Sequence, residues 1–552
     1  MAEQTSLDPH ALESARTAIA DGRVSLGIEF GSTNIKACLI DEECRPLATG
    51  SHAWENQLVD GYWTYALEDA VSGMQAAFAD LRVAVTSTYG VSLSGLASLG
   101  VSAMMHGYLP FADGELLANF RTWRNTNTGA AAAALTESFG VNIPLRWSIA
   151  HLHQAILDGE EHVRQVDFLT TLAGYIHWRL TGRQVLGVGD ASGMFPVTGG
   201  TAYDAGMVTT FDQLTRAARE AGQPAPAASV VDLLPEILTA GADAGRLSAE
   251  GAALLDPTGE LQAGALACPP EGDAGTGMVA TNAVAPRTGN VSAGTSIFAM
   301  VVLEQALGGV HHEIDLVTTP AGDPVAMVHC NNGASELGAW AGIFGEFADA
   351  LGAGSGTDEV FSALFAAALD AESDAGGLLA YNFLSGEPIA GLEAGRPLFA
   401  RTPDSSFTLG NFMRAQVYGV FGTLSLGLRV LEAEGVTIET MLAHGGLFKT
   451  AGAAQRFLSA AVDAPVAVAA TAATGGSWGM AVLAAYRLHA ADAAEAGRAV
   501  SRLGDYLSNT VFADVELSVA TATEAEREGY LAYLQRYEAA LPVDAAAAAH
   551  LT

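Results

Sequence analysis

Two short strand–turn–strand segments of similar design place the strongest limits on how this 552-residue chain can fold. The first, GIEFGSTNIKACLID at 27–41, has Gly-Ser-Thr at 31–33 between two apolar runs, which is typical of a β-hairpin. The second, GNVSAGTSIFAMVVL at 289–303, has Gly-Thr-Ser at 294–296 in the corresponding place. A repeat of this kind indicates two related domains that face one ligand, and the alternative is coincidence in a Gly-rich chain.

The first segment also combines charges in a way that suits a metal–phosphate site. Small residues at its turn leave backbone N–H groups uncovered, and Lys36 follows, so the turn can bind a phosphate. Glu29 precedes the turn and would repel a phosphate unless a cation lay between them. The alternative is that Gly and Ser mark only a hairpin turn.

Length and charge limit the classes of function. A chain of this length, half of it hydrophobic, is too long for one core and predicts two large domains. The formal net charge of −35 argues against a general nucleic-acid or anionic-membrane binder, because both need a positive face. Scattered cysteines, an N-terminus unlike a signal peptide and interrupted uncharged runs predict a cytoplasmic protein without membrane spans.

Apolar periodicity predicts α/β domains with mixed sheets. Three strands from 24 to about 57 precede an amphipathic helix over 67–85 and a strand that ends in a loop at 104–107. In the second half, a long helix over 412–435 follows the second strand–turn–strand segment. The Ala-rich tail at 541–552 is of low complexity and is expected to fray.

Seven motifs follow one another along residues 24 to 490: GIEFGSTNIKACLID, SAMMHG, PPEGDAGTG, SAGTSIFA, RAQVYGV, AHGGLFKTAGAAQRF and GGSWGMAVLAA. This ordered set resembles the FGGY carbohydrate kinases, within the larger actin/hexokinase/Hsp70 ATPase fold. The resemblance implies an α/β fold of two actin-like (ribonuclease H-like) domains, each a mixed β-sheet flanked by helices, with a cleft between. The implied ranges are an N-terminal extension at 1–23, a sugar-binding kinase domain at 24–286, a nucleotide-binding kinase domain at 287–540 and a tail at 541–552.

The resemblance makes Asp273, in PPEGDAGTG, the base that accepts the proton of a sugar hydroxyl. The alternative role is a helix N-cap, where Asp is preferred. The family usually has Asp to hold magnesium where this chain has Glu29, which is one methylene longer but can still serve a hydrated Mg²⁺. Asp273 is the second carboxylate expected at the metal, and the alternative for Glu29 is a buried acid paired with Lys36.

The resemblance also implies ATP as phosphate donor and places a set of turn residues on it. Phosphoryl transfer depends on positioning and charge neutralisation, which such turns supply. The phosphate and adenosine residues so implied are Gly31, Ser32, Thr33, Lys36, Gly294, Thr295, Ser296, Gly445, Gly446, Phe448 and Lys449. The last two depart from the family's commoner small-residue turn. The alternatives are structural turns for the glycines and a solvated strand position for Lys36.

SAMMHG is similar to the family's sugar-contact loop, which implies substrate contacts from Met105 and His106. Trp123, Arg124 and Asn125 stand where relatives bring further sugar contacts, and an aromatic ring beside a polar fork suits a polyol. The alternatives are a packed histidine, a core tryptophan and a surface arginine.

The resemblance implies a cytoplasmic, ATP- and Mg²⁺-dependent sugar kinase that acts on a small ketose. A pentulose such as xylulose is the first choice, because SAMMHG is nearest to xylulokinases and less near to gluconokinases. Ribulose, a tetrulose and gluconate stay open, and so does a homodimer. A non-catalytic sugar sensor and a chaperone- or filament-type ATPase are the rival classes, and neither nucleic acid nor membrane is expected as a partner.

Overall fold

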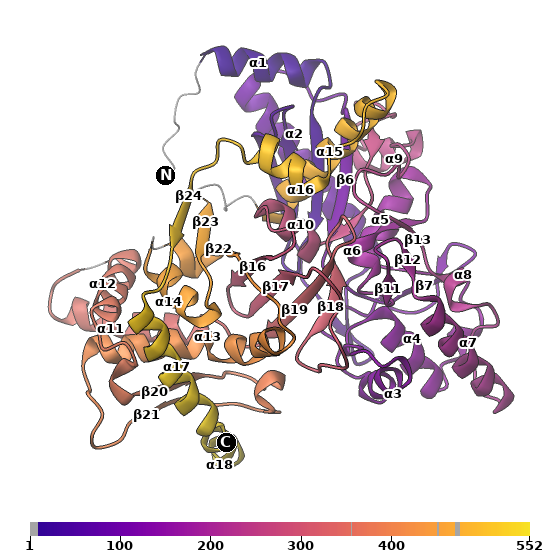
Figure 1. Cartoon of the computed structure of the whole chain (residues 1–552). Helices are drawn as coiled ribbons and strands as arrows, with labels where there is room; N and C mark the ends of the chain where they lie inside the picture. The colour runs from indigo at the N-terminus through magenta and orange to yellow at the C-terminus, as the bar shows by residue number, and fades with distance from the viewer. Residues whose placement is uncertain (1–8, 355, 450–451, 470–474, 552) are drawn as a thin grey trace. The chain divides into compact units, whose positions relative to one another are not determined.

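The computed structural model describes residues 9–354, 356–449, 452–469 and 475–551 (Figure 1). Contacts between residues divide the chain into two compact units. The first comprises Met1–Val284, Val317–Pro324 and Thr474–Asp514, and the second comprises Ala285–Leu316, Val325–Ala473 and Val515–Thr552. This division follows from contacts between residues alone, so the domain boundaries expected from the sequence remain a prediction.

The main sheet of the first unit is mixed, as the sequence predicts. Its strands run in the order β14-β6-β1-β2-β3, and β15 also pairs with β6. Strand β1 is antiparallel to β2 and parallel to β6, while β15 is parallel to β6. The ends of β1, β6 and β15 therefore meet at one edge of the sheet. The bounds are β1 Ser25–Phe30, β2 Asn34–Ile40, β3 Pro46–Ala53, β6 Ser98–Ala103, β14 Leu266–Ala267 and β15 Glu271–Gly272.

Three helices cover this sheet or pack beside it. Helix α2, Leu67–Tyr89, packs on β2 and β3 and confirms the helix predicted from the apolar spacing over 67–85. Helix α15, Gly475–Glu495, packs on β1 and β6, and helix α10, Asp273–Ala280, packs on α15. The approach of α15 is so close that a Cβ on Gly27 would lie 2.1 Å from the Ser477 carbonyl oxygen.

Smaller elements complete the first unit. Its other helices are α1 Pro9–Ala20, α3 Gly129–Phe139, α4 Ser148–Leu157, η1 Glu161–Arg164, α5 Leu172–Thr181, α6 Val188–Ala191, α7 Ala205–Glu220, α8 Val230–Leu233, α9 Ala249–Leu255, α16 Leu503–Tyr506 and η5 Leu507–Val511. Its other strands are β4 Gln57–Val59, β5 Tyr62–Thr64, β7 Leu109–Ala112, β8 Glu115–Leu116, β9 Phe168–Thr170, β10 Val185–Gly187, β11 Val197–Thr198, β12 Ala202–Tyr203 and β13 Glu236–Leu238.

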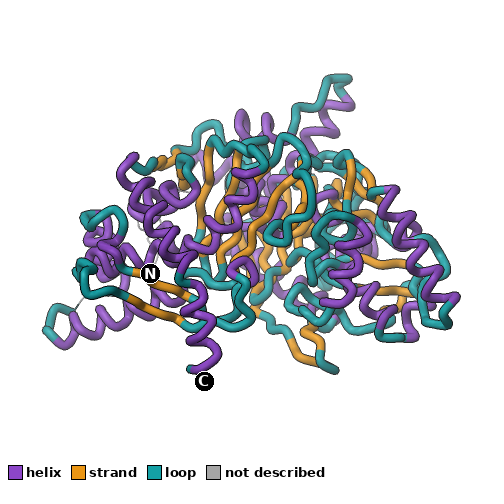
Figure 2. The backbone as a smooth tube through the Cα atoms, turned by 60° about the horizontal axis from the view of Figure 1, so that its bottom comes forward, coloured by secondary structure: helices purple, strands orange, loops and turns teal. Residues whose placement is uncertain are grey.

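The second unit has its own mixed sheet, in which the order β19-β17-β16-β22-β23-β24 occurs. Figure 2 shows strands of the chain's sheets in orange with purple helices beside them. The strands are β16 Thr288–Ala293, β17 Ile297–Val302, β19 Pro324–Cys330, β20 Leu379–Asn382, β21 Pro397–Ala400, β22 Thr440–His444, β23 Val466–Ala469 and β24 Leu517–Ala520. Strand β18, Asp315–Thr318, also pairs with β19, and the grouping by contacts divides it between the units. The helices are α11 Ser335–Ala350, α12 Thr357–Leu369, η2 Ala375–Gly377, η3 Pro388–Ala390, α13 Leu409–Ala433, η4 Gly446–Lys449, α14 Ala453–Val462, α17 Glu524–Ala539 and α18 Leu541–His550.

The two units repeat one arrangement around their hairpins. In the first, the antiparallel pair β1–β2 is extended by the parallel strand β6, and in the second β16–β17 is extended by the parallel strand β22. The loops after β6 and β22 therefore hold corresponding places. They carry two of the predicted site motifs, SAMMHG and AHGGLF.

The tail differs from the sequence prediction. Residues expected to fray form α18, whose Asp544 is buried and accepts a hydrogen bond from the Arg396 backbone N–H at 3.3 Å. Alanine has the highest helix propensity and a proline near the first turn is compatible with a helix, so this low-complexity segment folds. Among the described residues, no helix is long and apolar enough to cross a membrane.

Candidate active site

Strand register brings three predicted site segments to one edge of the first unit's sheet. Phe30 at the end of β1 pairs with Ala103 at the end of β6, and Ala103 also pairs with Gly272 of β15. The turn at 31–33, the loop at 104–107 and Asp273 follow directly after these three residues. The backbone N–H of Met104 donates to the Phe30 carbonyl at 2.9 Å and so ties the loop to the turn's strand.

Asp273 is held by the loop at 104–107. It is the first residue of α10, and the cap position belongs to Gly272. The Met105 N–H donates to Asp273 Oδ1 at 3.0 Å. Burial raises the pKa of Asp273, although N–H groups of Met105 and of its own helix start lower it. A carboxylate whose pKa is raised in this way is a stronger base than a free aspartate and can accept a proton.

Glu29 lies at the start of α15. Its Oε2 accepts the backbone N–H of Ser477 at 3.2 Å, and a Cβ on Gly476 would lie 2.2 Å from its Oε1. Burial and the nearby negative charge of Asp273 raise the pKa of Glu29, while Lys36 and the Ser477 N–H lower it. Lys36 is its cross-strand partner in the hairpin and is exposed.

The electrostatics of this pair suit a hydrated divalent cation. Two carboxylates whose charges disfavour one another are stabilised when a cation shares them. In the described part of the chain, no group of three or more His, Cys, Asp or Glu side chains could hold a metal. Glu29 and Asp273 would therefore supply only two protein ligands to a metal. Such a small number suits Mg²⁺, because this ion keeps several waters and also binds phosphate oxygens.

The turn at 31–33, which the sequence predicts to bind phosphate, presents its N–H groups on the side away from the core. The indole of Trp54 donates to the Gly31 carbonyl at 2.7 Å, and the hydroxyl of Tyr65 donates to the Ser32 carbonyl at 2.7 Å. A trans peptide has its C=O and N–H on opposite sides, so the N–H groups of Ser32 and Thr33 point away from these two rings. Such a pair of amides suits a phosphate.

His106 has a strained backbone and a close partner. Its φ is +69°, which is uncommon outside glycine, and the side chain is buried. Ring Nδ1 lies 3.2 Å from the Gly193 carbonyl oxygen, so this nitrogen carries the proton and donates it. A Cβ on Gly193 would lie 2.6 Å from Nδ1, which shows how closely the segment 190–193 packs on the histidine.

Two buried acids lie behind the candidate site: Asp190, which the sequence marked only weakly, and Glu271, which it did not mark. Glu271 accepts the N–H of Asp190 at 2.9 Å and that of Gly189 at 3.3 Å, and Thr171 donates to Asp190 at 2.6 Å. Burial and the nearby charge of Asp273 raise the pKa of Asp190 to about 7, and burial and the charge of Asp190 raise that of Glu271 to about 8. The only signal in the sequence was their place in GDASGM and PPEGDAGTG.

The predicted sugar residues at 123–125 have different surroundings. Arg124 stacks on the Trp63 ring at 4.2 Å and donates to Asn56 at 3.2 Å. Asn125 is buried, accepts the Trp63 N–H and donates to the Trp63 carbonyl, both at 2.8 Å. This side chain therefore clamps the β4–β5 hairpin. Trp123 is 36% exposed.

The predicted nucleotide residues of the second unit gather at the ends of β16 and β22. The turn Gly294, Thr295 and Ser296 is anchored by N–H donation from Gly333 to the Thr295 carbonyl at 2.7 Å. Gly445 has φ +108°, and a Cβ there would lie 2.3 Å from the Ala293 carbonyl oxygen, so the two turns are adjacent.

The predicted nucleotide residues after Gly445 have different surroundings. A Cβ on Gly446 would meet nothing within 4 Å. Phe448 is buried in the unit's hydrophobic core. The side chain of Lys449 lies outside the described part of the chain.

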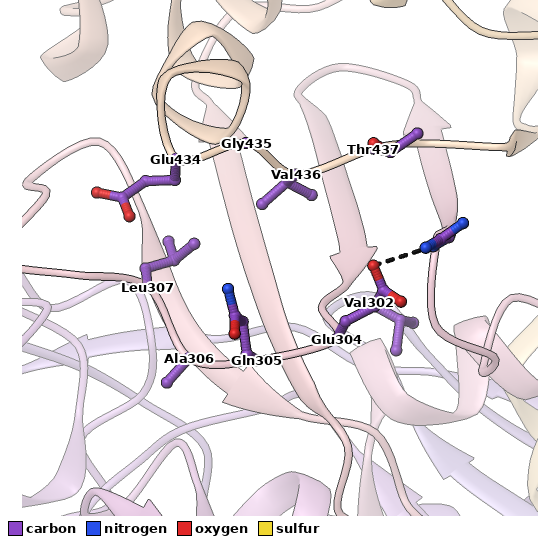
Figure 3. A pocket seen from close by; sticks show the side chains of 10 residues that line it. Val302, Glu304, Gln305, Ala306, Leu307, Glu434, Gly435, Val436 and Thr437 are labelled. Atoms are coloured by element: carbon purple, nitrogen blue, oxygen red, sulfur yellow. Dashed lines mark ion pairs between the residues drawn. The ribbon is translucent and has the colours of Figure 1, made fainter.

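A pocket of about 270 Å³ in the second unit is separate from these predicted residues (Figure 3). It lies between Val302–Leu307 and Glu434–Thr437. Arg287 at its edge pairs with Glu304 and Glu439, each at 3.0 Å. The guanidinium charge is thus already balanced.

Comparisons with known proteins agree with this fold. The model of the FGGY family of carbohydrate kinases, C-terminal domain, matches residues 289–488. The structure is similar to a xylulose kinase from Lactobacillus acidophilus, at 17% identity and a TM-score of 0.73, over 96% of this chain and 99% of that chain. It is also similar to a gluconate kinase from Lactobacillus acidophilus, at 17% identity, a TM-score of 0.72 and the same coverage. A glycerol kinase from Plasmodium falciparum, with ADP, is similar at 14% identity and a TM-score of 0.70, over 93% of this chain and 97% of that chain. Among curated proteins, none matches the sequence.

The chain thus has the fold of these solved xylulose and gluconate kinases. Residues 289–488 match the C-terminal domain of the FGGY family of carbohydrate kinases, whose members are phosphotransferases with an alcohol group as acceptor. The resemblance and the fold class predicted from the motifs are thereby confirmed. The named activities of the similar structures differ, so the acceptor has to be argued from the site.

Proposed function

We propose that this chain transfers the γ-phosphate of ATP to a hydroxyl of a small ketose, with a pentulose such as xylulose as the first choice. The observation that carries the proposal is the hydrogen bond from the Met105 N–H to Asp273 Oδ1 at 3.0 Å. It joins the base to the loop that bears His106. A hydroxyl that contacts His106 is then delivered to the carboxylate, and such positioning supplies much of the rate.

Each charged or polar group has a part in this reaction. Asp273 accepts the hydroxyl proton as the oxygen attacks the γ-phosphorus and ADP leaves with the bridging oxygen. The raised pKa of Asp273 strengthens it as a base. The N–H groups of Ser32 and Thr33 bind phosphate oxygens, and the second-unit turn Gly294–Ser296 has the same role. Bound Mg²⁺ supplies charge neutralisation at the phosphates, and Glu29 and Asp273 would face it directly or through water.

The acceptor class rests on the loop and on the neighbours' named activities. SAMMHG resembles xylulokinases most, and a xylulose kinase is among the similar structures. Gluconate stays the main alternative because a gluconate kinase is similar to the same extent, and ribulose and a tetrulose are further alternatives. A positioned base with a raised pKa argues against a sensor without chemistry. Cytoplasmic location and a homodimer also belong to the proposal.

The test is ADP release from Mg-ATP with a panel of acceptors: xylulose, ribulose, erythrulose, glycerol and gluconate. We expect one ketose to raise ADP release about 100-fold over the acceptor-free rate and Asp273→Ala to abolish that stimulation, because general bases contribute on this scale. Asp69→Ala is the matched control, since Asp69 is an exposed acid in the first turn of α2. An unstimulated wild type, or a variant at Asp273 that keeps the stimulated rate, refutes the proposal.

A further inference from the structure

Three buried polar atoms beside the sugar-contact loop have no part in the chemistry above. Among the described residues, the indole Nε1 of Trp147 and both ring nitrogens of His151 have no hydrogen-bond partner. Trp147 is 1% exposed and His151 is 0% exposed. Leaving a buried polar group unpaired is costly, so such atoms are rare unless something binds them. Both residues belong to one turn at the start of α4.

The start of α4 is bonded to the two segments that hold His106. The Ser148 hydroxyl donates to the carbonyl of Gly107, which follows His106. The Ile149 N–H donates to the carbonyl of Met194 at 3.1 Å, and Met194 follows Gly193. The unpaired nitrogens therefore belong to a turn that is fixed against the predicted acceptor site, not to a remote part of the core.

The surroundings of His151 favour a neutral ligand. The Tyr108 ring lies 6.2 Å from the His151 ring, and the Arg121 guanidinium lies 5.1 Å over Tyr108. Arg121 is paired with Glu160, so its charge is balanced, and Glu160 Oε1 is itself a buried atom without a partner. An acceptor that carries a carboxylate would find no unpaired positive charge among these residues and would be repelled by Glu160.

The hydrogen-bonding character of the two side chains matches hydroxyl groups. Burial, with a contribution from Arg121, lowers the pKa of His151 to about 3, so the imidazole is neutral at physiological pH. A neutral imidazole offers one donor and one acceptor, and the indole offers one donor. A hydroxyl both donates and accepts, so a polyol can satisfy all three nitrogens.

We propose that Trp147 and His151 bind hydroxyl groups of the acceptor other than the one that reacts at Asp273, and that they select a neutral polyol over an aldonate. The inference rests on the proposed function, because it assigns further residues to the same acceptor. It adds a specificity role for α4, which the sequence motifs did not mark.

The same helix provides a matched control. His153 is also buried, and its Nδ1 also lacks a partner. It packs on the Phe211 ring at 5.8 Å, and two residues along a helix place it on another side from His151. A substitution at His153 therefore reproduces the change in packing and polarity without touching the proposed contact.

The experiment compares Trp147→Phe, His151→Phe and His153→Phe for acceptor KM, ATP KM, melting temperature without ligand, and acceptor binding by calorimetry without ATP. We expect the first two variants to raise the acceptor KM and Kd about tenfold each, which corresponds to about 1.4 kcal/mol. The KM for ATP should stay within about twofold of the wild-type value, because the lost contacts bind the acceptor and not the nucleotide. His151→Phe should not melt lower than the wild type, since it removes unpaired buried atoms. His151→Gln keeps a donor and an acceptor and should lie nearer to the wild type.

The outcomes separate this inference from the proposed function. If the wild type turns over a ketose while Trp147→Phe and His151→Phe bind it normally, the nitrogens serve the core or a bound water and the inference fails alone. It also fails if His153→Phe weakens the acceptor as much, or if the wild type prefers gluconate to xylulose. If no acceptor binds or stimulates the wild type, both proposals fail.

Discussion

Gly193→Ala tests the role of His106 without altering a polar group. Gly193 contributes the carbonyl that holds His106 Nδ1, and it has no side chain on the face toward the ring. An added Cβ would lie 2.6 Å from Nδ1 and 2.8 Å from Met105 Cε. The methionine methyl can move, whereas the histidine ring sits on a backbone already held at φ +69°.

The size of the effect follows from this geometry. Ordinary contacts of a Cβ begin at 3.4 Å, so the ring has to shift by about 0.8 Å, and misplacements near 1 Å can cost about 10²-fold in rate. We therefore expect kcat/KM for the acceptor to fall by about 30- to 100-fold. Overpacking should also lower the free energy of unfolding by about 1–3 kcal/mol.

The assay is acceptor-stimulated ADP release, with KM for ATP and the melting temperature measured on the same preparations. Gly129→Ala is the control, because a Cβ on Gly129, in the same unit, meets nothing within 4 Å. It should behave as the wild type. A Gly193→Ala enzyme that is folded and keeps the wild-type acceptor kcat/KM would falsify the role given to His106.

Three further predictions concern the metal, the packing and the buried acids. Glu29→Gln should raise the Mg²⁺ concentration for half-maximal rate about tenfold, with acceptor KM unchanged, and a Mg²⁺ titration in which the variant matches the wild type would contradict it. Gly27→Ala should lower the free energy of unfolding by about 3 kcal/mol or more, because its Cβ would meet backbone atoms of α15 at 2.1 and 2.3 Å, and denaturant unfolding measures this. Burial and the charge of Asp190 raise the pKa of Glu271 to about 8, so the folded chain keeps a proton that the unfolded chain releases near pH 4.5. The free energy of unfolding should therefore fall as the pH rises from 4.5 to about 8, by up to about 1.4 kcal/mol per pH unit. Glu271→Gln should show a shallower decline across that window, and an equal slope would show that another group titrates.

Local sequence patterns predicted the helices and strands well where apolar residues recur at regular spacing along one face. The spacing in 67–85 and 412–435 predicted α2 and α13, and Gly-Ser-Thr between apolar runs predicted the first hairpin. The tail was misjudged because composition was taken as a sign of fraying, although alanine favours a helix.

The motifs of the candidate site could be recognised in the sequence, but their arrangement in space could not. The register that places Phe30, Ala103 and Gly272 side by side joins segments far apart in the chain. The anchoring of the turn at 31–33 by Trp54 and Tyr65 depends on the same long-range packing, and so does the burial of Asp190 and Glu271. No local period or turn rule could reveal these contacts.

The measurement that tests the central claim most directly is phosphoryl transfer by Asp273→Asn. Phosphorus NMR would follow the phosphate monoester formed from Mg-ATP and the preferred ketose, with acceptor binding measured by calorimetry on the same protein. If Asp273 is the base, the variant binds the acceptor within about threefold of the wild type but forms product at least about 100-fold more slowly. A variant that binds the ketose and still makes the monoester at the wild-type rate would contradict the account.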